Sequence, residues 1–215
     1  MKPRKLNKLS FEDQVDYLHF RSNECIIPLN DNYLNIYPCL VTSISKLPLD
    51  EINLALIGSA VFGWMPTQLY LQKSELDIAL RILTGLKDNQ VSLNSSNIQE
   101  LANIFQTIGG KSVVSASKLL HFVYPKSYPI WDRRVAKKFG LPANGAEAAE
   151  NYFKFLEFCR IMAGQNRVKQ SLQIFQSRLK DAGYTYQMSP IRLIELLLFF
   201  RIREMTLKNF SFTKT

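Results

Sequence analysis

Two adjacent glycines, Gly109 and Gly110, stand between two segments with the apolar spacing of amphipathic helices. Residues 96–105 and residues 112–123 both repeat apolar side chains every three or four positions, which is typical of helices that bury one face. Glycine adopts backbone conformations that are closed to other residues, so the chain can turn tightly here. Such a turn exposes the N–H groups that begin the second helix, and these groups can bind a phosphate. The sequence therefore predicts a helical hairpin that faces an anion.

A loop with two prolines follows the second helix and leads to a single aspartate, Asp132. The prolines of residues 125–129 lack the N–H that a helix needs and restrict the residue before them. A short basic helix is expected after Asp132 and ends at Gly140. Its first turn contains Arg133 and Arg134, and cations there cost about 0.3–1 kcal/mol each unless an anion is near. Asp132 supplies one anion, and a phosphate could supply another.

This order of glycine hairpin, second helix, proline loop and aspartate resembles the helix-hairpin-helix DNA glycosylase superfamily. Within it, Ala116–Phe122 (ASKLLHF) and Pro129–Val135 (PIWDRRV) look most like the 8-oxoguanine-glycosylase-like branch. The similar stretch, Ile108–Gly140, covers about 33 of the 215 residues, and Ser189–Glu195 resembles the same branch more weakly. The resemblance implies that Asp132 stabilises the cationic sugar that forms as the base leaves, and that it helps to activate the nucleophile.

Bifunctional members of this superfamily carry a nucleophilic lysine near the start of the hairpin's second helix, and two lysines are candidates here. Lys118 lies fourteen residues before Asp132 and Lys111 lies twenty-one before it, whereas the spacing in the familiar members falls between these two. If Ala116 matches the small residue that follows the family lysine by two, Val114 holds the lysine's place and Lys118 lies one helical turn further on. Residues i and i+4 share a helix face, so we favour Lys118 over Lys111. Without a lysine nucleophile the enzyme would use water or would be inactive.

Two further groups of side chains are candidates for contact with DNA. Excision requires the base to be flipped out of the duplex, which calls for phosphate contacts and for apolar groups that wedge or stack against bases. Candidates for phosphate contact are Gly109, Gly110, Lys111, Ser112, Arg133, Arg134 and Lys137. Candidates for the base pocket or the wedge are Phe62, Trp64, His121, Phe122 and Trp131. The simpler interpretations are a solvated helix face for the cations, core positions for the ring side chains, and an N-cap for Asp132.

These features favour a DNA glycosylase, with or without AP-lyase activity, that acts on double-stranded DNA containing a modified base. An 8-oxoguanine-like purine is the first candidate by resemblance alone. The reaction needs a carboxylate near C1′ and either an activated water or an amine nucleophile, and Asp132 and Lys118 carry these groups. Two alternatives stay open: a DNA-binding protein that kept this fold without the chemistry, and a helical module whose basic half binds an acidic protein.

Helical patterns extend over the whole chain without a series of strands, so we expect an all-α fold. We expect one compact domain over residues 1–215, a two-lobed helical bundle with lobes at about 1–95 and 96–215. Residues 1–100 hold 9 Lys and Arg against 11 Asp and Glu, whereas residues 101–215 hold 18 against 7. This concentration of the net charge of +9 indicates an anionic partner. Nucleic acid fits better than a membrane, because the chain has no run of 18 apolar residues.

Capping patterns predict where several of these helices begin. The last helix is expected to run from residue 191 to residue 204. The predicted N-terminal signals are Ser10 with Asp13, Asp50 after Pro48, Ser96 with Gln99, and Ser189 before Pro190.

No metal site and no cofactor are expected. Cys25, Cys39 and Cys159 are far apart, they form no C-x-x-C pair, and the chain has only two histidines. The N-terminal residues lack the apolar segment of a secretory signal. We therefore expect a monomeric, cytoplasmic protein.

Overall fold

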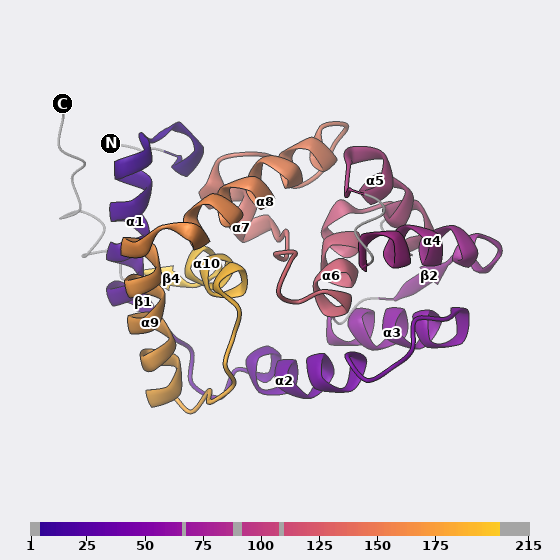
Figure 1. Ribbon diagram of the computed structural model, residues 1–215, viewed down its shortest axis with the longest axis horizontal. Coiled ribbons are helices and arrows are strands. Elements are labelled where there is room, and N and C mark those ends of the chain that lie inside the picture. The colour runs from indigo at the N-terminus through magenta and orange to yellow at the C-terminus, as the bar shows by residue number, and fades with distance from the viewer. Residues whose placement is uncertain (1–4, 66–67, 88–91, 108–109, 203–215) are drawn as a thin grey trace.

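The computed structural model describes residues 5–65, 68–87, 92–107 and 110–202, and these are mainly helical (Figure 1). The all-α class expected from the sequence is therefore confirmed. No helix in these ranges combines the length and the apolar character that a bilayer crossing requires. The helices are η1 (Leu6–Lys8), α1 (Phe11–Glu24), α2 (Asn32–Ile44), α3 (Glu51–Trp64), η2 (Lys73–Glu75), α4 (Leu76–Lys87), α5 (Ser95–Ile104), α6 (Val113–Val123), α7 (Arg133–Phe139), α8 (Ala148–Gly164), α9 (Asn166–Asp181) and α10 (Pro190–Phe199).

Short strands form two small antiparallel pairings. β1 (Cys25–Ile26) pairs with β4 (Arg201–Ile202), and β2 (Leu69–Leu71) pairs with β3 (Phe105–Thr107). The first pairing explains why the last helix is shorter than expected. The helix ends at Phe199 rather than at residue 204, because Phe200 is extended (φ −67°, ψ 159°) and the chain then enters β4.

Side-chain caps confirm most of the predicted helix starts. The predicted cap of α5 at Ser96 is wrong by two residues, because Asn94 and Asn97 form a reciprocal capping box instead. Each of these amide side chains accepts the other residue's backbone N–H, so two N–H groups that the helix leaves unpaired are satisfied. Two predicted caps form: Ser10 accepts the N–H of Asp13 at 3.2 Å, and Ser189 accepts that of Arg192 at 3.3 Å. In the stretch of proline and acids where a helix start was expected, Asp50 caps α3 by accepting the N–H of Asn53 at 2.8 Å.

The helices form two groups that share one hydrophobic core (Figure 1). Helices α1 and α7–α10 pack together in one group, and α3–α6 pack together in the other with the β2–β3 pairing. Helix α2 lies along the edge between the groups and contacts α3 and α6. The expected lobe boundary near residue 95 does not match this division, because α1 packs against α9 and α10, whereas α4 packs against α5.

Gly140 ends α7, as the sequence predicts, in the left-handed backbone region (φ 106°). Its N–H donates to the carbonyl oxygen of Ala136 at 2.8 Å. A β-carbon at this position would lie 2.4 Å from Oδ1 of Asn7 and 2.5 Å from Cβ of Lys5. The N-terminal segment therefore packs so closely against the end of α7 that only glycine fits there.

Candidate active site

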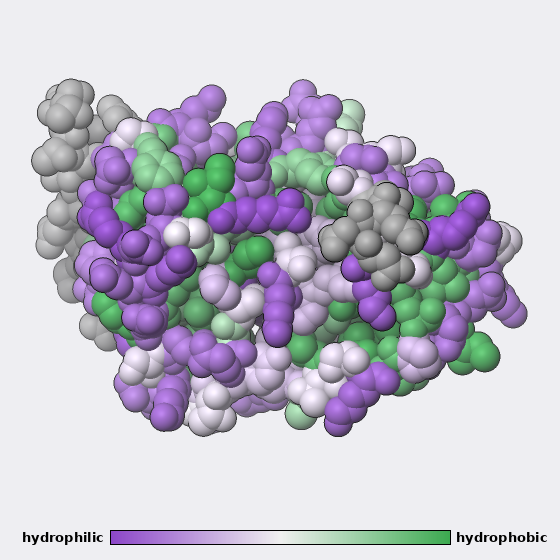
Figure 2. All heavy atoms as spheres, viewed as in Figure 1, coloured by the Kyte–Doolittle hydropathy of each residue, from purple (hydrophilic) through white to green (hydrophobic). Residues whose placement is uncertain are grey.

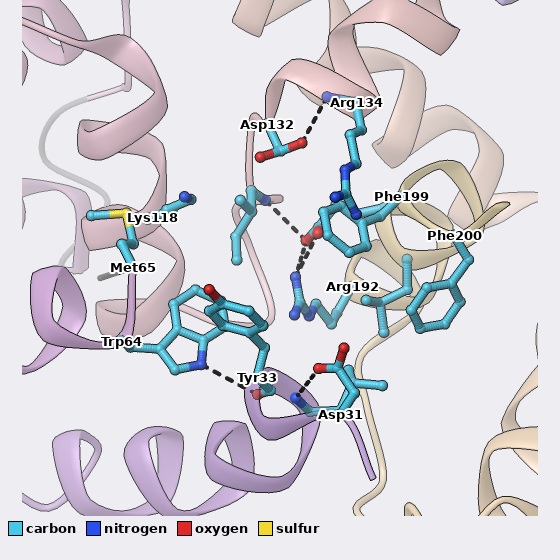
Figure 3. Close-up of a pocket in the computed structure, with 14 residues that line it drawn as sticks. Asp31, Tyr33, Trp64, Met65, Lys118, Asp132, Arg134, Arg192, Phe199 and Phe200 are labelled. Carbon is cyan, nitrogen blue, oxygen red and sulfur yellow. Dashed lines mark hydrogen bonds and ion pairs between the residues drawn. The ribbon is translucent and has the colours of Figure 1, made fainter. Parts of the chain in front are cut away.

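A cavity of about 410 Å³ opens between the two groups of helices (Figures 2 and 3). Its walls come from the start of α2, the end of α3, the middle of α6, the segment that leads into α7, and α10. This volume falls within the range of roughly 300–1,000 Å³ that is typical of small-ligand sites. The lining side chains include Asp31, Tyr33, Trp64, Met65, Lys118, Asp132, Arg134, Arg192, Glu195 and Phe199.

Lys118 extends from α6 into this cavity (Figure 3). Lys111 lies two residues before α6, where it is exposed and does not line the cavity. Burial lowers the pKa of the Lys118 amine, and the negative charges of Asp132 and Glu195 partly oppose that effect. Desolvation acts in this direction because it disfavours the charged form of an amine. The structure thus brings Lys118, and not Lys111, to the cavity that Asp132 also lines.

Asp132 has the N-cap position that its sequence context predicts. One carboxylate oxygen, Oδ1, accepts the backbone N–H of Arg134 at 2.7 Å. Among the described residues, Asp132 and Lys118 form no ion pair within 4.0 Å, and both side chains point into the same space (Figure 3). The carboxylate can therefore cap α7 and still present its second oxygen to a ligand beside the amine.

The segment before Asp132 is held in place by side chains from three helices. Ser117 in α6 accepts the N–H of Trp131 at 2.9 Å, and Glu195 in α10 accepts the N–H of Ile130 at 3.2 Å. In the same segment, Tyr152 in α8 donates to the carbonyl oxygen of Pro129 at 3.3 Å. The backbone that positions the aspartate is therefore fixed by partners distant in sequence.

Arg192 and Glu195 form an ion pair in the cavity wall, and they are only 3% and 2% exposed. Nη1 of Arg192 donates to both carboxylate oxygens of Glu195. Burial raises the pKa of Glu195, while the pairing with Arg192 and the N–H of Ile130 act in the opposite direction. On its other side the guanidinium lies over the ring of Tyr37, with Cζ 4.6 Å from the ring centre.

Of the five ring side chains predicted to form the base pocket or the wedge, only Trp64 lines the cavity. Its indole N–H donates to the carbonyl oxygen of Tyr33 at 3.2 Å, and its ring meets the rings of Tyr33 and Phe122 edge to face. Phe62 and Phe122 are 1% exposed and belong to the core. Neither can contact a base in this structure, because neighbouring helices cover both rings.

Trp131 and His121 are also corrections to the predicted pocket, because both are fully buried away from the cavity. Trp131 packs against Phe139 and Phe155. His121 bridges the hydroxyl of Tyr37 at 2.8 Å and the carbonyl oxygen of Tyr128 at 2.7 Å. Burial, with a smaller contribution from the charge of Arg192, lowers the pKa of His121 to about 3.

The candidates for phosphate contact lie just before α6 and on α7. One of them, Gly109, lies outside the described residues. Gly110 has a φ of 89° and closes the turn, since its N–H donates to Thr107 at 2.8 Å and its carbonyl oxygen accepts the Thr107 N–H at 3.1 Å. Ser112 directly precedes α6 and makes no side-chain cap bond. Arg133, Arg134 and Lys137 are exposed on α7, and Arg134 lines the cavity with its guanidinium 4.9 Å from the ring centre of Phe199.

Several lining residues were not identified from the sequence. For Arg192 and Glu195 a signal exists, because two opposite charges three residues apart in an otherwise apolar helix indicate a buried pair. For Tyr33 and Phe199 the sequence offers no such signal, since exposed or core aromatic residues would have the same pattern.

Comparison with known proteins adds no relative. The chain matches no known family model, and neither the curated proteins nor the solved structures contain a significant match.

Proposed function

We propose that this protein is a DNA glycosylase that excises a modified base from double-stranded DNA and, through Lys118, also acts as an AP lyase. The observation that carries the proposal is that Lys118 and Asp132 line one cavity. Base excision with an amine nucleophile needs such a pair beside the sugar. An 8-oxoguanine-like purine is the favoured base, by the sequence resemblance alone.

In the proposed reaction, the neutral amine of Lys118 attacks C1′ of the flipped nucleotide. The bond between C1′ and the base nitrogen breaks, and its electron pair leaves with the base. Asp132 accepts a proton from the attacking amine, and its charge stabilises the positive charge that develops on the sugar. Asp132 passes that proton to O4′ as the C1′–O4′ bond breaks, and the nitrogen lone pair forms the Schiff base. The carboxylate then takes a C2′ proton, and the C3′–O bond breaks with its electron pair leaving on the 3′ phosphate.

The lowered pKa of Lys118 supports this role, because only an unprotonated amine can attack. The fraction of neutral Lys118 grows as the pH approaches its pKa from below. We therefore expect the rate of adduct formation to rise with pH and to level off below 10.5, the ordinary pKa of lysine. With an unperturbed lysine, the rate of adduct formation would continue to rise up to that pH.

Aromatic side chains and cations around the cavity suit a flipped nucleotide. Tyr33, Trp64 and Phe199 offer ring faces and edges to a base. Exposed cations on α7 and at the hairpin are the proposed contacts for the DNA phosphates. We propose double-stranded DNA as the partner of a monomeric, cytoplasmic protein.

Borohydride trapping on duplexes that contain 8-oxoguanine or an abasic site tests the proposal. Wild-type protein should form a covalent adduct, since borohydride reduces the Schiff base to a stable amine. Lys118→Ala should form none. Lys169→Ala removes the same charge and length from an exposed position on α9 that does not line the cavity, and it should trap like the wild type.

The other results of this experiment separate the alternatives. Base release without a trapped adduct would mean that water is the nucleophile and that Lys118 is not. Tight duplex binding with neither release nor trapping, over a panel of modified bases, would leave a DNA-binding protein without chemistry. Absence of duplex binding at low salt would contradict the proposal altogether and favour a protein partner.

A further inference from the structure

We propose that Arg192 is a specificity-determining residue of the cavity, and that its guanidinium selects bases that carry a carbonyl oxygen over bases that carry none. The inference rests on the proposed function, because it takes the ligand of the cavity to be a nucleobase. It concerns which bases enter, however, and it does not depend on whether a bond is broken afterwards.

The hydrogen bonds of Arg192 leave most of its donors unused. A guanidinium carries five N–H donors, yet in the described part of the chain every side-chain hydrogen bond of Arg192 comes from Nη1 and goes to Glu195. Nε is buried without a partner among the described residues. Buried donors without an acceptor are unfavourable, so the site is incomplete as a purely structural ion pair.

Arg192 lines the cavity, so its guanidinium lies within reach of a ligand there. Its side chain lines the cavity although the residue is only 3% exposed, and it reaches from α10 toward the side that Trp64 closes (Figure 3). Tyr37 covers one face of the guanidinium, and Glu195 fixes one of its edges. Glu195 is itself held by the N–H of Ile130. The guanidinium is therefore fixed in orientation before a ligand arrives.

A fixed guanidinium discriminates between bases by their acceptors. Arginine binds the carbonyl oxygen and the neighbouring nitrogen of guanine-type edges, which are hydrogen-bond acceptors. An amino group at the same place, as in adenine, would bring donors against donors, and such a mismatch in a desolvated site excludes the wrong ligand. The cavity should therefore prefer keto purines.

Equilibrium binding of free bases tests this selectivity without any reaction. Hypoxanthine and purine differ in the carbonyl group at C6 and in the hydrogen on N1 that accompanies it, so they form a closely matched pair. Adenine has an amino group at C6. The chain has two tryptophans, of which Trp64 lines the cavity and Trp131 is fully buried, so fluorescence quenching should report binding at Trp64. Trp64→Phe should remove this signal. We expect wild-type protein to bind hypoxanthine about tenfold more tightly than purine, or better, and adenine no more tightly than purine.

Two variants test Arg192 itself. Arg192→Met alone leaves the carboxylate of Glu195 buried without its partner, which is strongly destabilising. Arg192→Met combined with Glu195→Gln removes both charges at similar volume, so it is the main variant, and Arg192→Lys keeps the charge without the planar donors. The combined variant should bind hypoxanthine and purine within about threefold of each other. Lys169→Ala, at an exposed position on α9 that does not line the cavity, should keep the wild-type preference.

Three results would overturn the inference: equal wild-type affinity for hypoxanthine and purine, binding of neither base, or an unchanged preference in the folded combined variant. Circular dichroism and thermal melting establish that the variant is folded. A protein that selects hypoxanthine but forms no adduct with DNA would retain this inference and lose the proposed reaction. A protein that forms the adduct but does not select the keto base would support the proposed reaction and contradict this inference.

Discussion

The hydroxyl oxygen of Ser117 accepts the backbone N–H of Trp131 at 2.9 Å, so the helix that carries Lys118 is bonded to the segment that carries Asp132. Ser117 directly precedes the lysine, and Trp131 directly precedes the aspartate. The Ser117 hydroxyl also donates to the carbonyl oxygen of Val114 at 2.8 Å, within its own helix. This buried hydrogen bond thus links directly the two segments that carry the amine and the carboxylate of the proposed active site.

Ser117→Ala should lower both stability and adduct formation. The Trp131 N–H would stay buried without an acceptor, which costs about 1–3 kcal/mol of unfolding free energy. A shift of the carboxylate relative to the amine should also slow trapping by roughly tenfold or more. Urea denaturation and single-turnover trapping measure the two effects. Ser127→Ala, an exposed position in the same segment, is the matched control, and equal stability of the two variants would show that the bond has no such role.

His121 should make the protein less stable as the pH falls. Nδ1 must donate to the carbonyl oxygen of Tyr128, so Nε2 accepts from the hydroxyl of Tyr37 and the ring is neutral. The folded pKa is about 3, whereas the ordinary value is 6.5. Between these values the unfolded chain binds a proton that the folded chain does not. Stability is therefore fully present above pH 6.5 and is lost toward pH 3, by at most about 1.4 kcal/mol per pH unit.

Denaturation of wild type and His121→Gln across pH 4.5–7 measures this contribution. Glutamine can donate to Tyr128 and accept from Tyr37, but it does not titrate, so its unfolding free energy should depend less on pH. Nuclear magnetic resonance of the two histidines in the chain gives the folded pKa directly. A His121 ring that titrates above pH 6 in the folded protein would contradict the prediction.

Gly140→Ala should destabilise the protein by more than 1 kcal/mol, a cost on the order of that of a side chain forced into the left-handed region. The added methyl group would also meet Asn7 and Lys5 at less than 3.0 Å. Gly63 provides the control, because it lies inside α3 and a β-carbon added there would have no atom within 4 Å. Gly63→Ala should be neutral or stabilising, since alanine favours helix. Thermal melting of both variants checks the difference.

The exposed cations of α7 should determine how strongly duplex binding depends on salt. If Arg133 and Lys137 each neutralise one phosphate, the double alanine variant should reduce the slope of log K against log salt by about 2. Lys169 and Lys180 are also exposed, on α9, which does not line the cavity. Their double alanine variant removes the same charge and should change the slope little. Equal slopes of log K against log salt in the two variants would show that α7 does not contact the DNA phosphates.

Local sequence determined most of the helix boundaries and one part of the candidate site. The caps at Ser10 and Asp50, the stop at Gly140 and the cap position of Asp132 were all predictable, because each depends on hydrogen bonds within four residues of the chain. The start of α5 shows where this fails. Asn94 and Ser96 are both good caps, and the local pattern does not choose between them.

Tertiary structure decided which lysine meets the aspartate and what surrounds the pair. The spacing of Lys111 and Lys118 from Asp132 allowed either lysine to be the candidate nucleophile. Only the packing of α6 against α3 and α5 brings Lys118 to the cavity. The walls that carry Tyr33 and Arg192 lie far from Asp132 in sequence. Apolar periodicity indicates that a side chain such as His121 or Trp131 turns inward, but not what it packs against. That partner depends on contacts between distant segments, which form only when the whole chain folds.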